Sequence, residues 1–124
     1  VQRYINIYGF EDLLDRLPPT LKRLDMDGGR NNTSASPLSQ KILNFKGLKV
    51  LHVENSLSEL PANLGALQEL EFISVPNNPS LKTIPLSVLT IPKLEVLNVR
   101  GNKGMEVPQE IIDWGEEDGH FLIQ

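Results

Sequence analysis

The sequence contains no cysteine, which excludes disulfides, thiolate zinc sites and cysteine nucleophiles from its 124 residues. It also lacks an excess of basic charge, because 12 Lys and Arg residues against 16 Asp and Glu residues give a net charge of −4. Nucleic acids and anionic membranes are bound by basic surfaces, so this balance argues against both partners. No apolar run approaches the ~20 residues that span a bilayer. No charged-then-apolar signal segment opens the chain. We therefore expect neither nucleic-acid binding nor membrane insertion.

What is present is an ordinary globular composition, with 40% hydrophobic and 23% charged residues. A chain of this length suffices for one domain and can bury roughly two-thirds of its unfolded surface. We predict a single domain over residues 1–124. The first residue is Val1 rather than Met, so we expect this domain to be part of a longer chain.

Leucine dominates the composition, and its 20 occurrences follow a repeating frame. The frame is LxxLxL, a nearby Asn, an apolar–Pro pair and two further apolar residues three positions apart. Three clear copies begin at Leu48, Leu70 and Leu94. With less regular copies upstream, the fourth position of the frame falls on Ile5, Leu24, Leu51, Ile73 and Leu97. The successive differences are 19, 27, 22 and 24 residues.

A further copy is predicted at the end of the chain. Adding 24 residues to Leu97 reaches Phe121, so we expect a last strand with Phe121 at its fourth position, although a count from Pro108 places the register one residue earlier. Trp114 occupies the position of Leu67 in its repeat, and we expect it to close the core at this end.

The frame predicts parallel strands joined by short helical returns. Positions four and six of LxxLxL alternate with a period of two and point into the core, and no such strand is stable without a neighbour. Apolar residues three and six positions after Pro61, Pro85 and Pro108 form one face of a short helical turn. Side-chain amides are suited to the bends after the strands, where the sequence has Asn55, Asn77 or Asn78, and Asn102.

The stretch of about 28–47 departs from the frame and is predicted to be an irregular insertion. Its first part, Gly28 to Ser36, has the composition of a loop. Ser36 followed by Pro37 indicates a helix N-cap, so we predict a helix over about 38–45. Its buried face would carry Leu38, Ile42 and Phe45.

At these residues the chain resembles the leucine-rich repeat superfamily over roughly 1–124. The segment Leu17 to Leu24 resembles the bacterial LPxxL subclass. The repeats with Leu60–Pro61 and Ile84–Pro85 resemble as much the intracellular type found in plant immune receptors and Ras-pathway scaffolds. The resemblance implies an α/β fold: a right-handed solenoid with five to six parallel strands on the concave side and short helices on the convex side.

The same resemblance implies a non-catalytic module that recognises another protein on its concave face, without a cofactor. The module could be the sensor or targeting part of a bacterial effector, a surface protein or an immune receptor. We expect a monomer. We expect it to be either cytoplasmic, or a bacterial protein that is secreted or held at the cell surface. A disulfide-rich extracellular member is not expected, because the cysteine-rich caps of that branch are missing. The alternative is a structural spacer or capping domain within a larger protein.

Strand residues that point away from the core are expected to form three rows across the concave face. The first row is Tyr4, Arg23, Val50, Phe72 and Val96; the second is Asn6, Asp25, His52, Ser74 and Asn98; the third is Tyr8, Asp27, Glu54, Pro76 and Arg100. Exposed aromatic residues near Arg are typical of binding hot spots. We predict that the partner contacts Tyr4, Arg23, Val50, His52, Glu54, Phe72, Ser74, Val96, Asn98 and Arg100.

The second row also allows a remote alternative, a hydrolase or metal site at His52, Asp25 and Ser74. A nucleophilic triad requires an oxyanion hole and a pocket, which a regular sheet surface does not offer. We therefore expect no catalytic, metal or cofactor site, and favour a polar row in which Asp25 pairs with His52. The chain from Gly104 onward contains six acidic residues and no basic one, which we interpret as a solvated end face.

Overall fold

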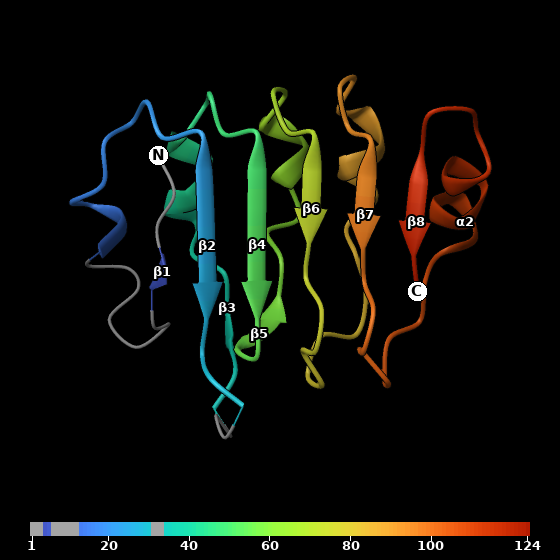
Figure 1. Ribbon diagram of the computed structural model, residues 1–124, viewed down its shortest axis with the longest axis horizontal. Helices are drawn as coiled ribbons and strands as arrows, with labels where there is room; N and C mark the ends of the chain where they lie inside the picture. The colour runs from blue at the N-terminus through green and yellow to red at the C-terminus, as the bar shows by residue number, and fades with distance from the viewer. Residues whose placement is uncertain (1–3, 6–12, 31–33) are drawn as a thin grey trace.

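The computed structural model describes residues 4–5, 13–30 and 34–124. Its main feature is a parallel sheet whose strands follow one another in chain order (Figure 1). The strands are β1 (Tyr4–Ile5), β2 (Arg23–Asp27), β4 (Val50–Glu54), β6 (Phe72–Ser74), β7 (Val96–Asn98) and β8 (Phe121–Ile123). The fold is therefore α/β, with a parallel sheet and few helices.

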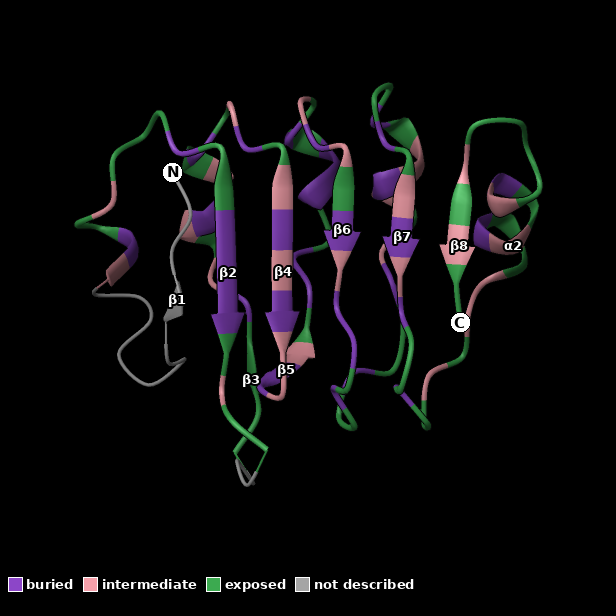
Figure 2. Ribbon diagram, viewed as in Figure 1, coloured by how far each residue is buried: buried purple, intermediate pink, exposed green. Residues whose placement is uncertain are grey.

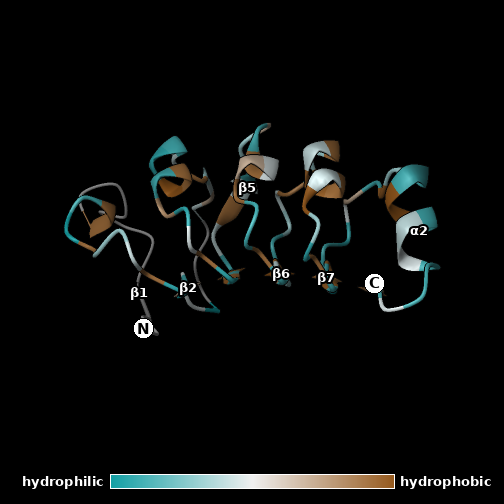
Figure 3. Ribbon diagram, turned by 90° about the horizontal axis from the view of Figure 1, so that it is seen from above, coloured by the Kyte–Doolittle hydropathy of each residue, from teal (hydrophilic) through white to brown (hydrophobic). Residues whose placement is uncertain are grey.

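Short helices return the chain from the end of one strand to the start of the next. They are the 3₁₀ helices η1 (Gln40–Asn44), η2 (Leu64–Ala66) and η3 (Leu86–Thr90) and the α-helix α2 (Gln109–Gly115). All four lie on one side of the sheet (Figure 3). The opposite side, which we call the open face, carries no helix in the described part of the chain. No described helix has the length and hydropathy needed to cross a membrane.

Alternation along the strands separates core from surface, as the frame predicts. In β4, Leu51 and Val53 are buried, whereas Val50, His52 and Glu54 are partly exposed. The return segments supply the other wall of the core, and the predicted apolar pairs are all buried: Leu64, Leu67, Val88, Ile91, Ile111 and Trp114. Figure 2 shows buried residues in the middle of β2, β4, β6 and β7. The strand pattern and the helical returns are thus confirmed.

The bends after the strands depend on two different kinds of position. Asn78 is buried; its Nδ2 donates to the carbonyls of Val53, Val75 and Pro76, and its Oδ1 accepts from the N–H groups of Ser56 and Leu57. One unit later, the Oδ1 of Asn102 accepts from the N–H of Asn78.

Asn55 occupies the other kind of position, and its Nδ2 donates to the Oδ1 of Asp27. Like Asn77, it has a positive φ, of 60° and 57° respectively, and the equivalent residue one unit later is Gly101 with a φ of 78°. The buried position of the first clear unit is held by Ser56, so the assignment of Asn55 to this role was wrong. Asn is suited to both kinds of position. At the buried position its side-chain amide binds backbone groups, and at the positive-φ position it tolerates the left-handed region.

The register of β1 differs from the predicted one. Tyr4 pairs with Asp25 and Ile5 with Met26, whereas the frame places Tyr4 beside Arg23 and Ile5 beside Leu24. A shift of two residues leaves the same side chains facing the core, so hydrophobic alternation cannot detect it. Tyr4 therefore belongs to the second row by backbone register. Its side chain, and the predictions for Asn6 and Tyr8, lie outside the described residues.

The predicted register of β8 was also wrong. Leu122, not Phe121, pairs with Leu97. The return from Pro108 to Leu122 takes 14 residues, against 12 from Pro85 to Leu97, because an α-helix and its following turn replace the shorter 3₁₀ helix. A one-residue slip exchanges the faces of a strand. Phe121 consequently points to the open face and is 62% exposed.

The predicted helix over 38–45 is shorter and begins later. Ser36–Pro37 forms β3, which pairs in parallel with β5 (Leu57–Glu59). The N-cap is Ser39, whose Oγ accepts from the N–H of Lys41. Pairing with β5 satisfies the backbone that a helix would otherwise use, because Ser36 and Leu38 donate to the carbonyls of Ser56 and Glu59. The predicted core residues Leu38, Ile42 and Phe45 are nevertheless buried.

Candidate binding face

Strand register brings most of the predicted binding residues together on the open face. Arg23, Val50, Phe72, Val96 and Phe121 are opposite one another on β2, β4, β6, β7 and β8. We call Val50, Phe72, Val96 and Phe121 the apolar row. Phe72 is 39% exposed, and Val50 and Val96 are partly exposed on either side of it.

Sequence reasoning missed the contribution of β8 to this face. Phe121 extends the apolar row by one strand, and Ile123, which is opposite Asn98, is 42% exposed. The available signal was Leu122, which fits the buried fourth position as well as any residue of the frame. The unequal length of the last return segment concealed it.

Three residues of the second row are linked by hydrogen bonds that cross three strands. The Nδ2 of Asn98 donates to the Oγ of Ser74 at 3.3 Å, and this Oγ lies 3.1 Å from the Nδ1 of His52. The Nε2 of His52 lies 3.2 Å from the Oε1 of Glu54. The Nδ2 of Asn77 donates to the Oε2 of Glu54 at 2.8 Å. An ionised Glu54 carboxylate can only accept a hydrogen bond. A neutral His52 in this hydrogen-bonded series therefore carries its proton on Nε2, and its Nδ1 accepts a hydrogen bond from the Ser74 hydroxyl.

Asp25 takes no part in that series, although its backbone is opposite His52. It is buried, and its two carboxylate oxygens accept from the Nε of Arg23 at 3.1 and 3.2 Å. The predicted Asp25–His52 pair was therefore wrong, and Glu54 is the carboxylate that contacts His52. The Asp25 carboxylate binds the stronger donor. The guanidinium of Arg23 is always charged, whereas a neutral His52 donates from only one ring nitrogen.

Asp27 and Glu54 lie beside this row, at the ends of β2 and β4. With Arg23, Asp25, Met26 and His52 they line a hollow of about 250 Å³. The hydrogen bond from the Asn55 amide lowers the pKa of Asp27, and the Gly29 N–H and the charge of His52 lower it further, against the opposing effect of burial. Within the described residues no group of three His, Cys, Asp or Glu side chains is arranged to hold a metal ion.

Trp114 and His120 close the core at the last strand. Trp114 is 7% exposed, and its ring stacks on that of His120 at a centroid distance of 4.2 Å. The Nδ1 of His120 donates to the carbonyl of Trp114 at 2.8 Å. The prediction that Trp114 closes the core at this end is confirmed.

Comparisons with known proteins give limited matches. No known family model matches the chain, and no curated protein matches it. Among solved structures, the chain is similar to the leucine-rich repeat ectodomain of the receptor kinase SOBIR1 from Arabidopsis thaliana, with 22% sequence identity and a TM-score of 0.39. The match covers 71% of this chain and 60% of that ectodomain, so this chain spans less than two-thirds of the structure it matches.

Proposed function

We propose that the chain is a leucine-rich repeat solenoid that binds a partner protein on its open face and catalyses no reaction. The repeat frame and the chain-order pairing of the strands support the solenoid. Leu17–Pro18 and Leu60–Pro61 favour the LPxxL type of repeat, in a bacterial or intracellular setting. The observation that carries the binding function is the apolar row, in register across four strands and bordered by a hydrogen-bonded polar row.

The apolar row has the properties of an interface centre. Adjacent strands lie ~4.8 Å apart, so Val50, Phe72 and Val96 present about 10 Å of continuous apolar surface. A central aromatic side chain of this kind contributes most to binding when its surroundings exclude water. Phe121 lengthens the row toward the end of the sheet.

The polar row beside it is held in place before any partner binds. His52 and Ser74 already make hydrogen bonds, so their side chains lose little freedom when a partner contacts them. They offer specific polar contacts next to the apolar row. This arrangement favours an extended or convex protein surface with apolar side chains along one line and polar groups along the next.

The test is a capture experiment with a matched pair of variants. Phe72→Glu places a charge in the apolar row, whereas Leu86→Glu places the same charge at a residue of similar exposure, 44% against 39%, on the helical side of the sheet. Each protein is immobilised, exposed to lysate and analysed by mass spectrometry after its melting curve has been compared with wild type. We expect a partner that is retained by wild type and Leu86→Glu but lost with Phe72→Glu.

Identical sets of captured proteins from all three samples would contradict binding through the open face and favour the spacer alternative. If a partner is found, titration with the purified partner gives its affinity for each variant. We expect Phe72→Glu to weaken it about thirtyfold or more, because loss of a hot-spot side chain costs about 2 kcal/mol or more.

A hydrolase is the second candidate, because Ser74, His52 and Glu54 form the hydrogen-bonded series of a nucleophile, a base and an orienting carboxylate. A fluorophosphonate probe tests it, since an activated serine is phosphonylated on Oγ with loss of fluoride. We expect no labelling, because acyl transfer also requires preorganised donors for an oxyanion. Labelling that disappears in Ser74→Ala would establish the hydrolase and displace the recognition function.

A further inference from the structure

The hydrogen-bonded series on the open face, which runs from Asn98 through Ser74 and His52 to Glu54, is fixed at both of its ends. At one end, the Oδ1 of Asn98 accepts from the N–H of Arg100 at 3.1 Å, so the amide is held with its Nδ2 toward Ser74. At the other end, Glu54 accepts from His52, and an ionised carboxylate has no proton to donate. Asn98 therefore remains a donor and Glu54 remains an acceptor.

The bond between His52 and Ser74, in the middle of the series, can run in either direction. Its two atoms, the Nδ1 of His52 and the Oγ of Ser74, lie 3.1 Å apart, and each can donate or accept. In a neutral ring, Nε2 carries the proton toward Glu54, so Nδ1 accepts from the hydroxyl. In a protonated ring both nitrogens donate, so Nδ1 donates to Oγ. Protonation of His52 therefore reverses this bond, whereas the bonds at the two ends keep their direction.

The reversal changes what Ser74, which is partly exposed, offers to a partner. When His52 is neutral, the hydroxyl proton of Ser74 points to the ring and its Oγ accepts from Asn98, which leaves one lone pair of Oγ free. When His52 is protonated, Oγ accepts from both His52 and Asn98, which uses both lone pairs and frees the hydroxyl proton. A partner group that contacts Ser74 thus meets an acceptor in the first state and a donor in the second.

The charged groups around His52 favour a partner that donates. The hollow of about 250 Å³ beside its ring is lined by three carboxylates and one guanidinium, those of Asp25, Asp27, Glu54 and Arg23. On the other side of the ring, β6 contributes Ser74, which carries no charge. With a neutral His52, negative charge therefore predominates among these described groups, and both Ser74 and Glu54 accept. A partner N–H group, carried by an amide or a cation, complements both of them.

We propose that His52 sets the hydrogen-bonding polarity of the open face, so that a partner that donates to Ser74 and Glu54 binds when His52 is neutral and is released when His52 is protonated. Protonation removes the acceptor at Ser74 and adds a positive charge beside the partner's donor. Histidine is the side chain whose charge ordinarily changes between pH 5 and 8, whereas aspartate and glutamate ordinarily stay ionised there. The release rests on the proposed function, because it concerns the same face, but the reversal of the His52–Ser74 bond does not.

NMR spectra of the free protein test the reversal. Long-range ¹H–¹⁵N correlations of the imidazole rings are recorded between pH 8 and pH 5, and the two histidines, His52 and His120, are assigned from their single Gln variants. We expect His52 to carry its proton on Nε2 at pH 8 and on both nitrogens at pH 5. The Nδ2 signals of Asn98 should follow the same titration curve, because the hydroxyl to which Asn98 donates turns away from His52. In Ser74→Ala this link is lost, so Asn98 should no longer follow His52.

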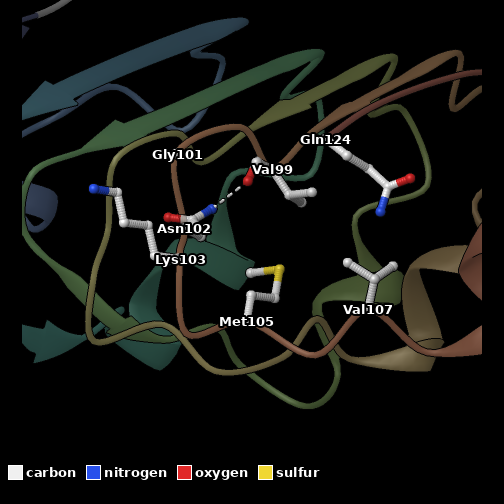
Figure 4. Close-up of a pocket in the computed structure, with 7 residues that line it drawn as sticks. All are labelled: Val99, Gly101, Asn102, Lys103, Met105, Val107 and Gln124. Carbon is white, nitrogen blue, oxygen red and sulfur yellow. Dashed lines mark hydrogen bonds between the residues drawn. The ribbon is translucent and has the colours of Figure 1, made fainter.

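Asn102 provides the internal control for these spectra. It is a buried asparagine, and its Nδ2 donates to the carbonyls of Val75 and Val99, neither of which titrates (Figure 4). Its side-chain signals should stay in place over the same pH range. A neutral His52 with its proton on Nδ1 would overturn the reversal, as would Asn98 signals that move no more than those of Asn102.

A change of pH applied to the captured partner tests the release. The protein that wild type retains and Phe72→Glu loses is purified, and its affinity is measured at pH 7.5 and at pH 5.5. We expect the affinity of wild type to be about tenfold weaker at pH 5.5, the effect of one lost hydrogen bond. His52→Gln cannot gain the proton, so its affinity should change less than twofold. His120→Gln, which removes the other histidine, should respond to pH as wild type does.

The outcomes separate this inference from the proposed function. A partner that depends on Phe72 but is held equally at both pH values would overturn the release and leave the proposed function intact. The same holds for a partner that is released equally from His52→Gln, because its own groups would then be the ones that titrate. Capture of no partner through the open face would contradict the proposed function and the release together, while the spectra would still decide the reversal.

Discussion

The units around β6 and β7 have a neighbour on both sides, whereas the unit of α2 and β8 has a described neighbour on one side only, and equivalent residues differ accordingly. Leu97 is fully buried, but its partner Leu122 is partly exposed. Phe72 is 39% exposed and Phe121 is 62% exposed. The sixth position of the frame is buried Val99 in one unit and exposed Gln124 in the other. A repeat residue thus owes its environment to the adjacent unit as much as to its own sequence.

The largest effect should come from the leucines of the two strands. Leu97→Ala should lower the free energy of unfolding by about 3–4 kcal/mol, because a fully buried leucine leaves a cavity. Leu122→Ala should cost roughly half as much, since Leu122 is partly exposed. Urea denaturation followed by circular dichroism measures both. Equal losses would show that the two units are equivalent and remove the basis of the comparison.

A smaller difference is expected between the two buried asparagines. Asn78 binds three carbonyls and two N–H groups through its side chain, whereas Asn102 binds two carbonyls and one N–H group. Asn78→Ala should cost about 2–3 kcal/mol and Asn102→Ala about 1–2 kcal/mol, since each leaves buried backbone groups without partners. Thermal melting orders the two variants. A larger loss for Asn102→Ala would mean that the last bend is more tightly packed than the interior one.

The smallest effect concerns the opposite end of the sheet, where the Asn55 amide donates to Asp27 at 2.9 Å. This bond lowers the pKa of Asp27 from 3.8, so its stabilisation is present above pH 3.8 and is lost as pH falls through the lower folded pKa. Asn55→Gly keeps the left-handed backbone but removes the amide, and should raise the pKa of Asp27. An NMR titration of its carboxyl carbon measures this. Asn77→Gly is the matched control, and an equal rise there would refute the assignment.

Local patterns predicted most of the architecture correctly. Alternation within LxxLxL identified the buried residues of β4, β6 and β7, and the spacing from Pro61, Pro85 and Pro108 identified the buried residues of the returns. These features succeed because each is decided within one unit, where strand and helix periods act on neighbouring residues. The same reasoning placed Val50, Phe72 and Val96 in one row, because the interior units have nearly equal lengths.

Most of the errors involve contacts between units. The predicted register of β1 differs from the observed one by two residues. The register of β8 depends on the length of the preceding return segment, which the repeat does not define. Ser36 and Pro37 have the composition of a helix start, but a strand partner 21 to 22 residues later makes them β3. His52 was expected to bind Asp25, yet Arg23 competes for that carboxylate. The two registers and the pairing of β3 with β5 depend on residues far apart in sequence, whereas Arg23 is only two positions from Asp25.

By itself the sequence determined the parallel strands, the side of each interior strand that is buried, the helical returns and the absence of cysteine chemistry, because these follow from residue type and short-range period. Only the tertiary structure decided which side chains meet on the open face, that Glu54 rather than Asp25 contacts His52, and that Phe121 and Ile123 lie on the open face. The reason is physical: strand register is set by contacts between residues about 20 or more positions apart. At His52, the distant Asp25 and the nearby Glu54 compete for one side chain, and that competition is resolved only when the units pack.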